Sequence, residues 1–65
     1  MQVLVNGIAY ALDATASLAD ALAAADARPP FAAALNLQFV PKAQYVATRL
    51  KTGDEIEVIS PITGG

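Results

Sequence analysis

Apolar and polar residues alternate at the start of the chain, in the pattern of a β-strand with one buried face. The stretch QVLVN shows this alternation, and Asn6-Gly7 separates it from a second apolar run, IAYAL. Asn-Gly between two such runs favours a type I′ turn, because both central residues of that turn need positive φ. The pattern therefore predicts an opening β-hairpin in which Gln2–Asn6 pairs with Ile8–Asp13.

The next stretch, SLADALAAADA, has the periodicity of a helix. Its leucines and every third or fourth alanine fall on one helical face. Ser17 is a favourable N-cap, and Asp20 three positions later gives an imperfect capping box, since glutamate is more usual there. Pro29-Pro30 cannot continue the helix, so we expect a helix over Ser17 to Ala27.

Three more strands are predicted in the second half of the chain. They cover FAAALN (31–36), QFV (38–40) and, after a glycine-containing turn, the alternating segment Glu55–Ser60. Between them, KAQYVATRL is compatible with one turn of helix that directs Tyr45 and Leu50 to the core.

This order of elements predicts an α+β domain, a mixed sheet of four to five strands with one main helix on one face. The last strand buries its apolar residues most easily beside the first strand, in the middle of the sheet. The predicted core consists of Val3, Val5, Tyr10, Leu12, Leu18, Leu22, Ala33, Leu35, Val40, Leu50, Ile56 and Val58.

Alternation also predicts which side chains face away from the helix. Leu4 and Ile59 would lie on the uncovered face, close together if the first and last strands pair, and Phe39 and Ile62 could join them. We favour an apolar docking patch, because it would lie beside the C-terminal segment. Scattered exposed apolar side chains, which need no function, are the alternative.

The chain contains no Cys and no His. Disulfides, cysteine zinc sites and the usual general base are therefore all missing. These absences disfavour an enzyme, and we expect the chain itself to bind no cofactor and no metal.

The net charge is −2, from six acidic and four basic residues. Without a basic stripe, nucleic-acid binding is not expected. Asp54, Glu55 and Glu57 form either a solvated strand end or an acidic rim that suits a basic partner. The start MQVLVN lacks the pattern of a signal peptide, so we expect none, and the longest uncharged run, PPFAAALNLQFVP, is too short and too polar to span a membrane. We expect a cytoplasmic protein that is monomeric when free.

The composition changes after Ser60, where Pro61 leaves the sheet and small residues lead to Gly64-Gly65. We expect a folded domain over residues 1–60 and a flexible C-terminal tail over residues 61–65. Five extended residues reach roughly 16 Å, enough to enter a narrow channel of another protein. Glycines without a β-carbon leave the carboxyl carbon unhindered, so Gly65 is a candidate acyl handle. The alternative is that the terminal residues have no function.

Three segments resemble the ThiS family, the sulfur carrier proteins of thiamine biosynthesis. They are MQVLVNG at the start, ALN with FVP in the middle, and GDEIEVISPITGG at the end, which is the most specific part. The resemblance covers the whole chain and implies a ubiquitin-like β-grasp fold; the small subunit of molybdopterin synthase and ubiquitin are more distantly similar. One departure is Leu37 after Asn36, where family members often carry Asn-Gly.

The resemblance also implies a mechanism. A ThiF-like adenylating enzyme would use ATP and magnesium to adenylate Gly65, with Gly64 providing the slender approach. A persulfide sulfur, from a cysteine desulfurase or another donor, would replace AMP and leave a thiocarboxylate. A ThiG-like thiazole synthase would then take the sulfur into the thiazole ring. Leu4 and Ile59 fall where the family presents its apolar partner surface, and the partner-binding residues we expect are Leu4, Phe39, Ile59, Pro61 and Ile62.

Other functions stay open at this point. A related β-grasp carrier could serve molybdopterin or another sulfur metabolite, although the short length favours the thiamine branch. A ubiquitin-like modifier would join Gly65 to a lysine of a target protein. A plain interaction domain would leave the tail inert.

Overall fold

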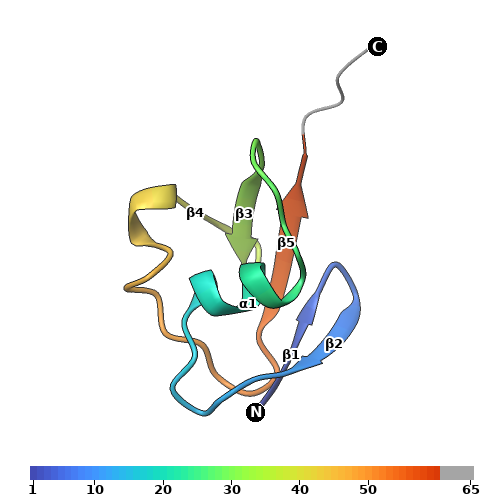
Figure 1. The fold of residues 1–65 in the computed structure, drawn as a ribbon. Coiled ribbons are helices and arrows are strands. Elements are labelled where there is room, and N and C mark those ends of the chain that lie inside the picture. Colours follow the sequence, from blue (N-terminus) through green and yellow to red (C-terminus); the bar gives the residue numbers. More distant parts are fainter. Residues whose placement is uncertain (61–65) are drawn as a thin grey trace.

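The computed structural model describes residues 1–60 of the chain. Residues 1–60 form five strands, one α-helix and a short 3₁₀ helix, in the order predicted from the sequence, and Figure 1 shows their arrangement. The elements are β1 (Gln2–Val5), β2 (Ile8–Ala11), α1 (Leu18–Ala24), β3 (Ala32–Leu35), β4 (Gln38–Val40), the 3₁₀ helix η1 (Lys42–Gln44) and β5 (Glu55–Ile59).

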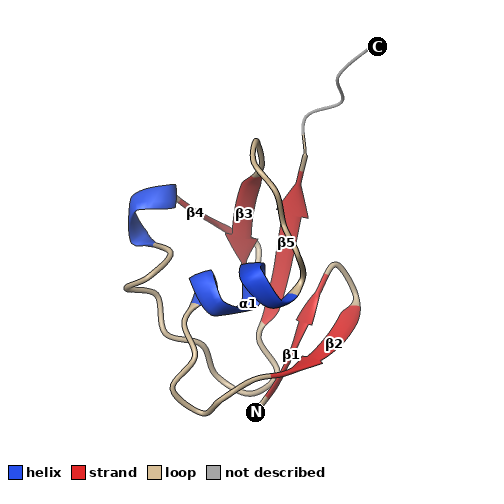
Figure 2. Ribbon diagram, viewed as in Figure 1, coloured by secondary structure: helices blue, strands red, loops and turns tan. Residues whose placement is uncertain are grey.

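The five strands form one mixed sheet in the order β2-β1-β5-β3-β4. β5 runs parallel to β1, and the other three neighbouring pairs are antiparallel. The last strand therefore lies beside the first in the middle of the sheet, as predicted. Figure 2 shows α1 lying across one face of this sheet. The arrangement confirms the expected ubiquitin-like β-grasp fold.

The opening hairpin has the predicted turn. Asn6 and Gly7 both have positive φ, 51° and 81°, and Val5 opposes Ile8 across the turn. The second hairpin, between β3 and β4, has the same pair of positive φ angles at Asn36 (49°) and Leu37 (70°). The structure thus uses leucine at a left-handed position where glycine would fit without a steric cost.

The helix begins as predicted and ends earlier than predicted. Ser17 Oγ accepts a hydrogen bond from the Asp20 N–H, and the Asp20 carboxylate accepts one from the Ser17 N–H at 2.8 Å, so the capping box is complete. The helix ends at Ala24 rather than Ala27, because Asp26 takes a left-handed φ of 56°. The Ala27 N–H then bonds back to the Leu22 carbonyl, a Schellman closure.

The core lies between α1 and the covered face of the sheet. Leu18 and Leu22 from the helix pack against Val3, Val5 and Ile56 from the two central strands. All twelve predicted core residues belong to this cluster or pack against its edge, Tyr10, Leu12, Leu35 and Val58 being only partly buried. The expected turn of helix after β4 is η1, with Tyr45 half-buried and Leu50 buried.

Candidate functional site

The sheet has a second face that α1 does not cover, and we call it the open face. In a sheet, directly opposed residues share a face and successive residues alternate between faces. Val3, Val5 and Ile56 pack against α1, so their neighbours in sequence belong to the open face. The open face carries Leu4 and Ala9, then Glu55, Glu57 and Ile59, then Ala32 and Ala34, and finally Phe39.

Two of the predicted docking residues lie on the same half of the open face. Phe39 on β4 opposes Ala34 on β3, and Ile59 on β5 opposes Ala32, which lies two residues before Ala34 on β3. Phe39 is 69% exposed and Ile59 is 57% exposed. We call these four residues the open-face patch. The small side chains of Ala32 and Ala34 on β3 separate the large side chains of Ile59 on β5 and Phe39 on β4. A side chain of a partner could enter between these two large residues.

Leu4 does not lie beside Ile59, so the expectation that they adjoin is wrong. Leu4 pairs with Glu55 at the start of β5, while Ile59 is four residues further along, about 13 Å in a strand. The parallel register causes this separation, because β1 ends at Val5, opposite Ile56. Leu4 is also half-buried rather than exposed.

The open face is acidic. Glu55 and Glu57 are both exposed and occupy the central strand, between Leu4 and the open-face patch. None of the described strand residues is a lysine or an arginine. A partner surface that covers this face must therefore bring positive charge to the two carboxylates.

Asp54 does not belong to this acidic surface, although the sequence placed it there. It is only 6% exposed. Its carboxylate accepts hydrogen bonds from the Lys51 N–H at 2.7 Å and from Asn36 Nδ2 at 3.0 Å. Asp54 therefore closes the turn before β5, and its role is structural.

Two asparagine side chains hold β5 at its two ends. At the start, Asn36 Oδ1 accepts a hydrogen bond from the Glu55 N–H at 3.0 Å. At the end, Asn6 Oδ1 accepts from the Val58 N–H at 2.8 Å and Asn6 Nδ2 donates to the Val58 carbonyl at 3.3 Å. The Asn6 side chain thus continues the pairing of β5 beyond the last residue of β1.

The sequence identified Asn6 only as a turn residue. Its contact with Val58 spans 52 positions along the chain, and no local pattern reveals such a contact. The end of β5, just before Ser60, is therefore held on one side by β3 and on the other by the Asn6 side chain. The position of Val58 near the end of β5 is thereby fixed.

The remaining predicted site residues, Pro61, Ile62, Gly64 and Gly65, lie outside the described residues, as does the expected tail as a whole. Over residues 1–60 there is no group of three or more acidic, His or Cys side chains that could hold a metal. No helix in this part of the chain is long and apolar enough to cross a membrane.

The strand order, the single helix on one face and a chain that continues past the last strand define a ubiquitin-like β-grasp protein. The family model of the ThiS family matches residues 3–65, and the chain belongs to that family. Among solved structures, it is similar to a thiamine biosynthesis protein (ThiS) from Geobacter metallireducens, with 25% identity, a TM-score of 0.79 and full coverage of both chains. No curated protein sequence matches the chain.

Proposed function

We propose that this chain is a sulfur carrier for thiamine biosynthesis and that its Gly65 carboxylate is the group on which sulfur travels. The family match carries the proposal, because it extends to residue 65 and so includes the Gly64-Gly65 pair. The composition supports it. A chain without cysteine has no thiol on which sulfur could be carried as a persulfide.

The proposed chemistry begins with activation, because a carboxylate resists nucleophiles until it has a leaving group. A ThiF-like enzyme, using ATP and magnesium, joins the Gly65 carboxylate to AMP and releases pyrophosphate. A persulfide from a cysteine desulfurase or a similar donor then displaces AMP, and cleavage of the S–S bond by a thiol leaves the thiocarboxylate. A ThiG-like thiazole synthase accepts the sulfur. The chain is a co-substrate in these steps and not their catalyst.

The folded part supplies recognition in this proposal. The open-face patch, formed by Phe39, Ile59, Ala32 and Ala34, lies at the end of the sheet from which the chain continues to Pro61. Glu55 and Glu57 flank it, so the adenylating enzyme is expected to present an apolar side chain within a basic surface. The hydrogen bonds of Asn6 to Val58 fix the strand end between this surface and the reacting terminus.

The decisive experiment is intact mass spectrometry of the chain after incubation with the adenylating enzyme of the same genome, ATP, magnesium and a persulfide donor. The expected product is heavier by the difference between one sulfur and one oxygen atom. A variant lacking Gly65 should keep its fold and gain no sulfur. An unchanged mass, with an enzyme shown to be active on a carrier of its own, would contradict the proposal.

A further inference from the structure

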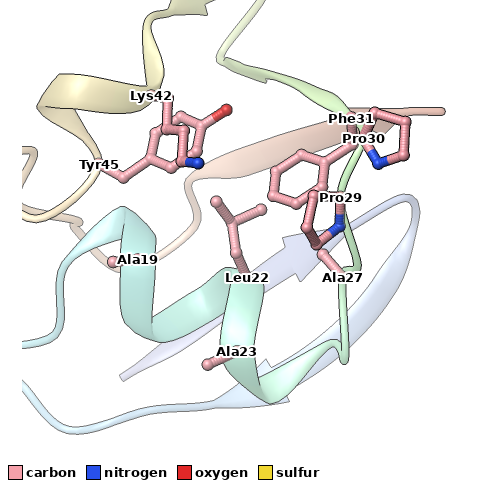
Figure 3. Close-up of a pocket in the computed structure, with 9 residues that line it drawn as sticks. All are labelled: Ala19, Leu22, Ala23, Ala27, Pro29, Pro30, Phe31, Lys42 and Tyr45. Carbon is pink, nitrogen blue, oxygen red and sulfur yellow. The ribbon is translucent and has the colours of Figure 1, made fainter. Parts of the chain in front are cut away.

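A pocket of about 550 Å³ opens on the helix side of the molecule, away from the open face (Figure 3). It lies between α1, the segment that leads into β3, and the region of η1. We call it the helix-side pocket. Leu22, Phe31 and Tyr45 are among the residues that line it.

The walls of this pocket are apolar and preformed. The rings of Phe31 and Tyr45 stack with their centroids 6.0 Å apart and their planes within 6° of each other. On the helix side, Ala19 and Ala23 lie one turn apart on α1 and Ala27 follows the end of the helix, and these small side chains leave the space that larger ones would fill. Aromatic walls around a space of this size are typical of binding sites.

Lys42 is the one charged residue that lines the pocket. Its side chain is exposed. Within residues 1–60 the only ion pair joins Arg28 to Asp26, so Lys42 has no acidic partner there. The pocket therefore combines an apolar interior with a positive charge at its rim, whereas the open face combines an apolar patch with negative charge.

The pocket is also too open to enclose a free metabolite. Ala23, Pro29, Pro30 and Lys42 are all exposed, so a small molecule would leave one side in water, whereas drug-sized ligands in their sites are about 70–90% buried. A protein surface can supply the missing wall. The chemistry of the lining then requires an apolar side chain with a carboxylate beside it.

The position of the pocket indicates which protein would cover it. Phe31 directly precedes Ala32, and Ala32 opposes Ile59, the last residue of β5. The pocket thus borders, on the helix side, the same strand end that the open-face patch borders on the other side. A protein that binds at this end of β5 is therefore the partner placed nearest to the pocket.

We propose that the helix-side pocket is a second docking site, in which an enzyme that handles the C-terminal glycine seats an apolar side chain flanked by a carboxylate facing Lys42. This inference rests on the proposed carrier function. It adds a contact that the sheet surface does not provide, and it gives the carrier two recognition surfaces of opposite charge on the two sides of one strand end.

The test compares pocket variants with matched controls in binding to the purified adenylating enzyme and thiazole synthase. Ala23→Gln places a side chain over the pocket, and Ala24→Gln makes the same change at the next exposed helix position, outside it. Lys42→Glu reverses the rim charge, and Lys51→Glu makes the same reversal elsewhere. For at least one enzyme, Ala23→Gln should weaken binding about tenfold, as loss of a central contact does. Lys42→Glu should weaken it most at low salt.

Four outcomes would overturn the inference. The first is wild-type affinity of both pocket variants for both enzymes. The second is a change in self-association of Ala23→Gln with enzyme binding unaltered, which makes a second copy the occupant. The third is a shift of the Gly64 and Gly65 amide resonances in free Lys42→Glu with enzyme binding unaltered, which makes the chain's own end the occupant. The fourth is failure of the wild-type chain to gain sulfur, which removes the carrier function and this site together.

Discussion

Asn6 has two roles: its backbone forms the hairpin turn, and its side chain hydrogen-bonds to Val58 of β5. Replacing Asn6 by glycine separates these roles. Glycine accepts the φ of 51° without strain, so the hairpin turn is kept. The side-chain hydrogen bonds to the Val58 N–H (2.8 Å) and carbonyl (3.3 Å) are lost. Because β1 ends at Val5, no backbone group of that strand can replace them.

The expected loss of stability follows from these two bonds. A protein hydrogen bond contributes about 0.5–1.5 kcal/mol net, and the low end applies here because both bonds are exposed. Glycine adds about 0.4–1 kcal/mol through the greater freedom of the unfolded chain. We therefore expect Asn6→Gly to lose about 1.5–2 kcal/mol. In a domain of this size, each 1 kcal/mol lowers Tm by roughly 4–8 °C.

Urea unfolding measures this loss, and amide hydrogen exchange locates it. In Asn6→Gly the Val58 amide should lose protection by more than global unfolding explains, while the Glu55 amide should not. Asn36→Gly is the matched control, since it also sits at positive φ in a hairpin turn and bonds to the other end of β5. It should show the reverse pattern. Sulfur loading should slow in Asn6→Gly at substrate concentrations below saturation. Unchanged stability together with unchanged Val58 protection would refute the role given to Asn6.

Three further substitutions test other parts of the structure. Leu37→Gly should stabilise the domain by about 0.5–1 kcal/mol in urea unfolding, since it relieves a left-handed leucine that is 87% exposed and loses no burial; a loss of stability would show that Leu37 makes an intramolecular contact. Asp54→Ala should cost about 2–3 kcal/mol, because it removes the charged acceptor of two partly buried hydrogen bonds, from the Lys51 N–H and from the Asn36 amide; a cost below about 0.5 kcal/mol would contradict this. Glu57→Lys should leave stability within about 0.5 kcal/mol and weaken binding of the adenylating enzyme, and tighter binding would place a negative surface over the open face.

The sequence predicted the elements and the core well because each depended on local periodicity. The alternation of QVLVN and EIEVIS and the capping box at Ser17 are local signals, and the structure follows them. The helix end was missed because the left-handed Asp26 closes it, and aspartate at that position carries a weaker signal than the prolines beyond it. The positive φ of Leu37 was not predicted either, because leucine at that position carries no local signal for a left-handed conformation.

The candidate site was less predictable, because it depends on contacts between distant segments. Alternation identified the face of Leu4 and Ile59 correctly, but only the parallel register fixes how far apart they lie. The stacking of Phe31 on Tyr45 joins two segments whose sequences show no relation. Both rings line the helix-side pocket, so no reading of either segment alone could reveal it.

The two proposed recognition surfaces bear on how the proposed carrier would tell its two enzymes apart. In the proposed function one terminus is presented in turn to an enzyme that activates it and to an enzyme that consumes its product, and a single surface of fixed charge cannot discriminate between them by electrostatics. Glu57 on one side of the strand end and Lys42 on the other give opposite fields within a small domain of net charge −2. If the two enzymes divide these surfaces, Lys42→Glu and Glu57→Lys will each weaken binding to a different enzyme, and raising the salt concentration will reduce both effects.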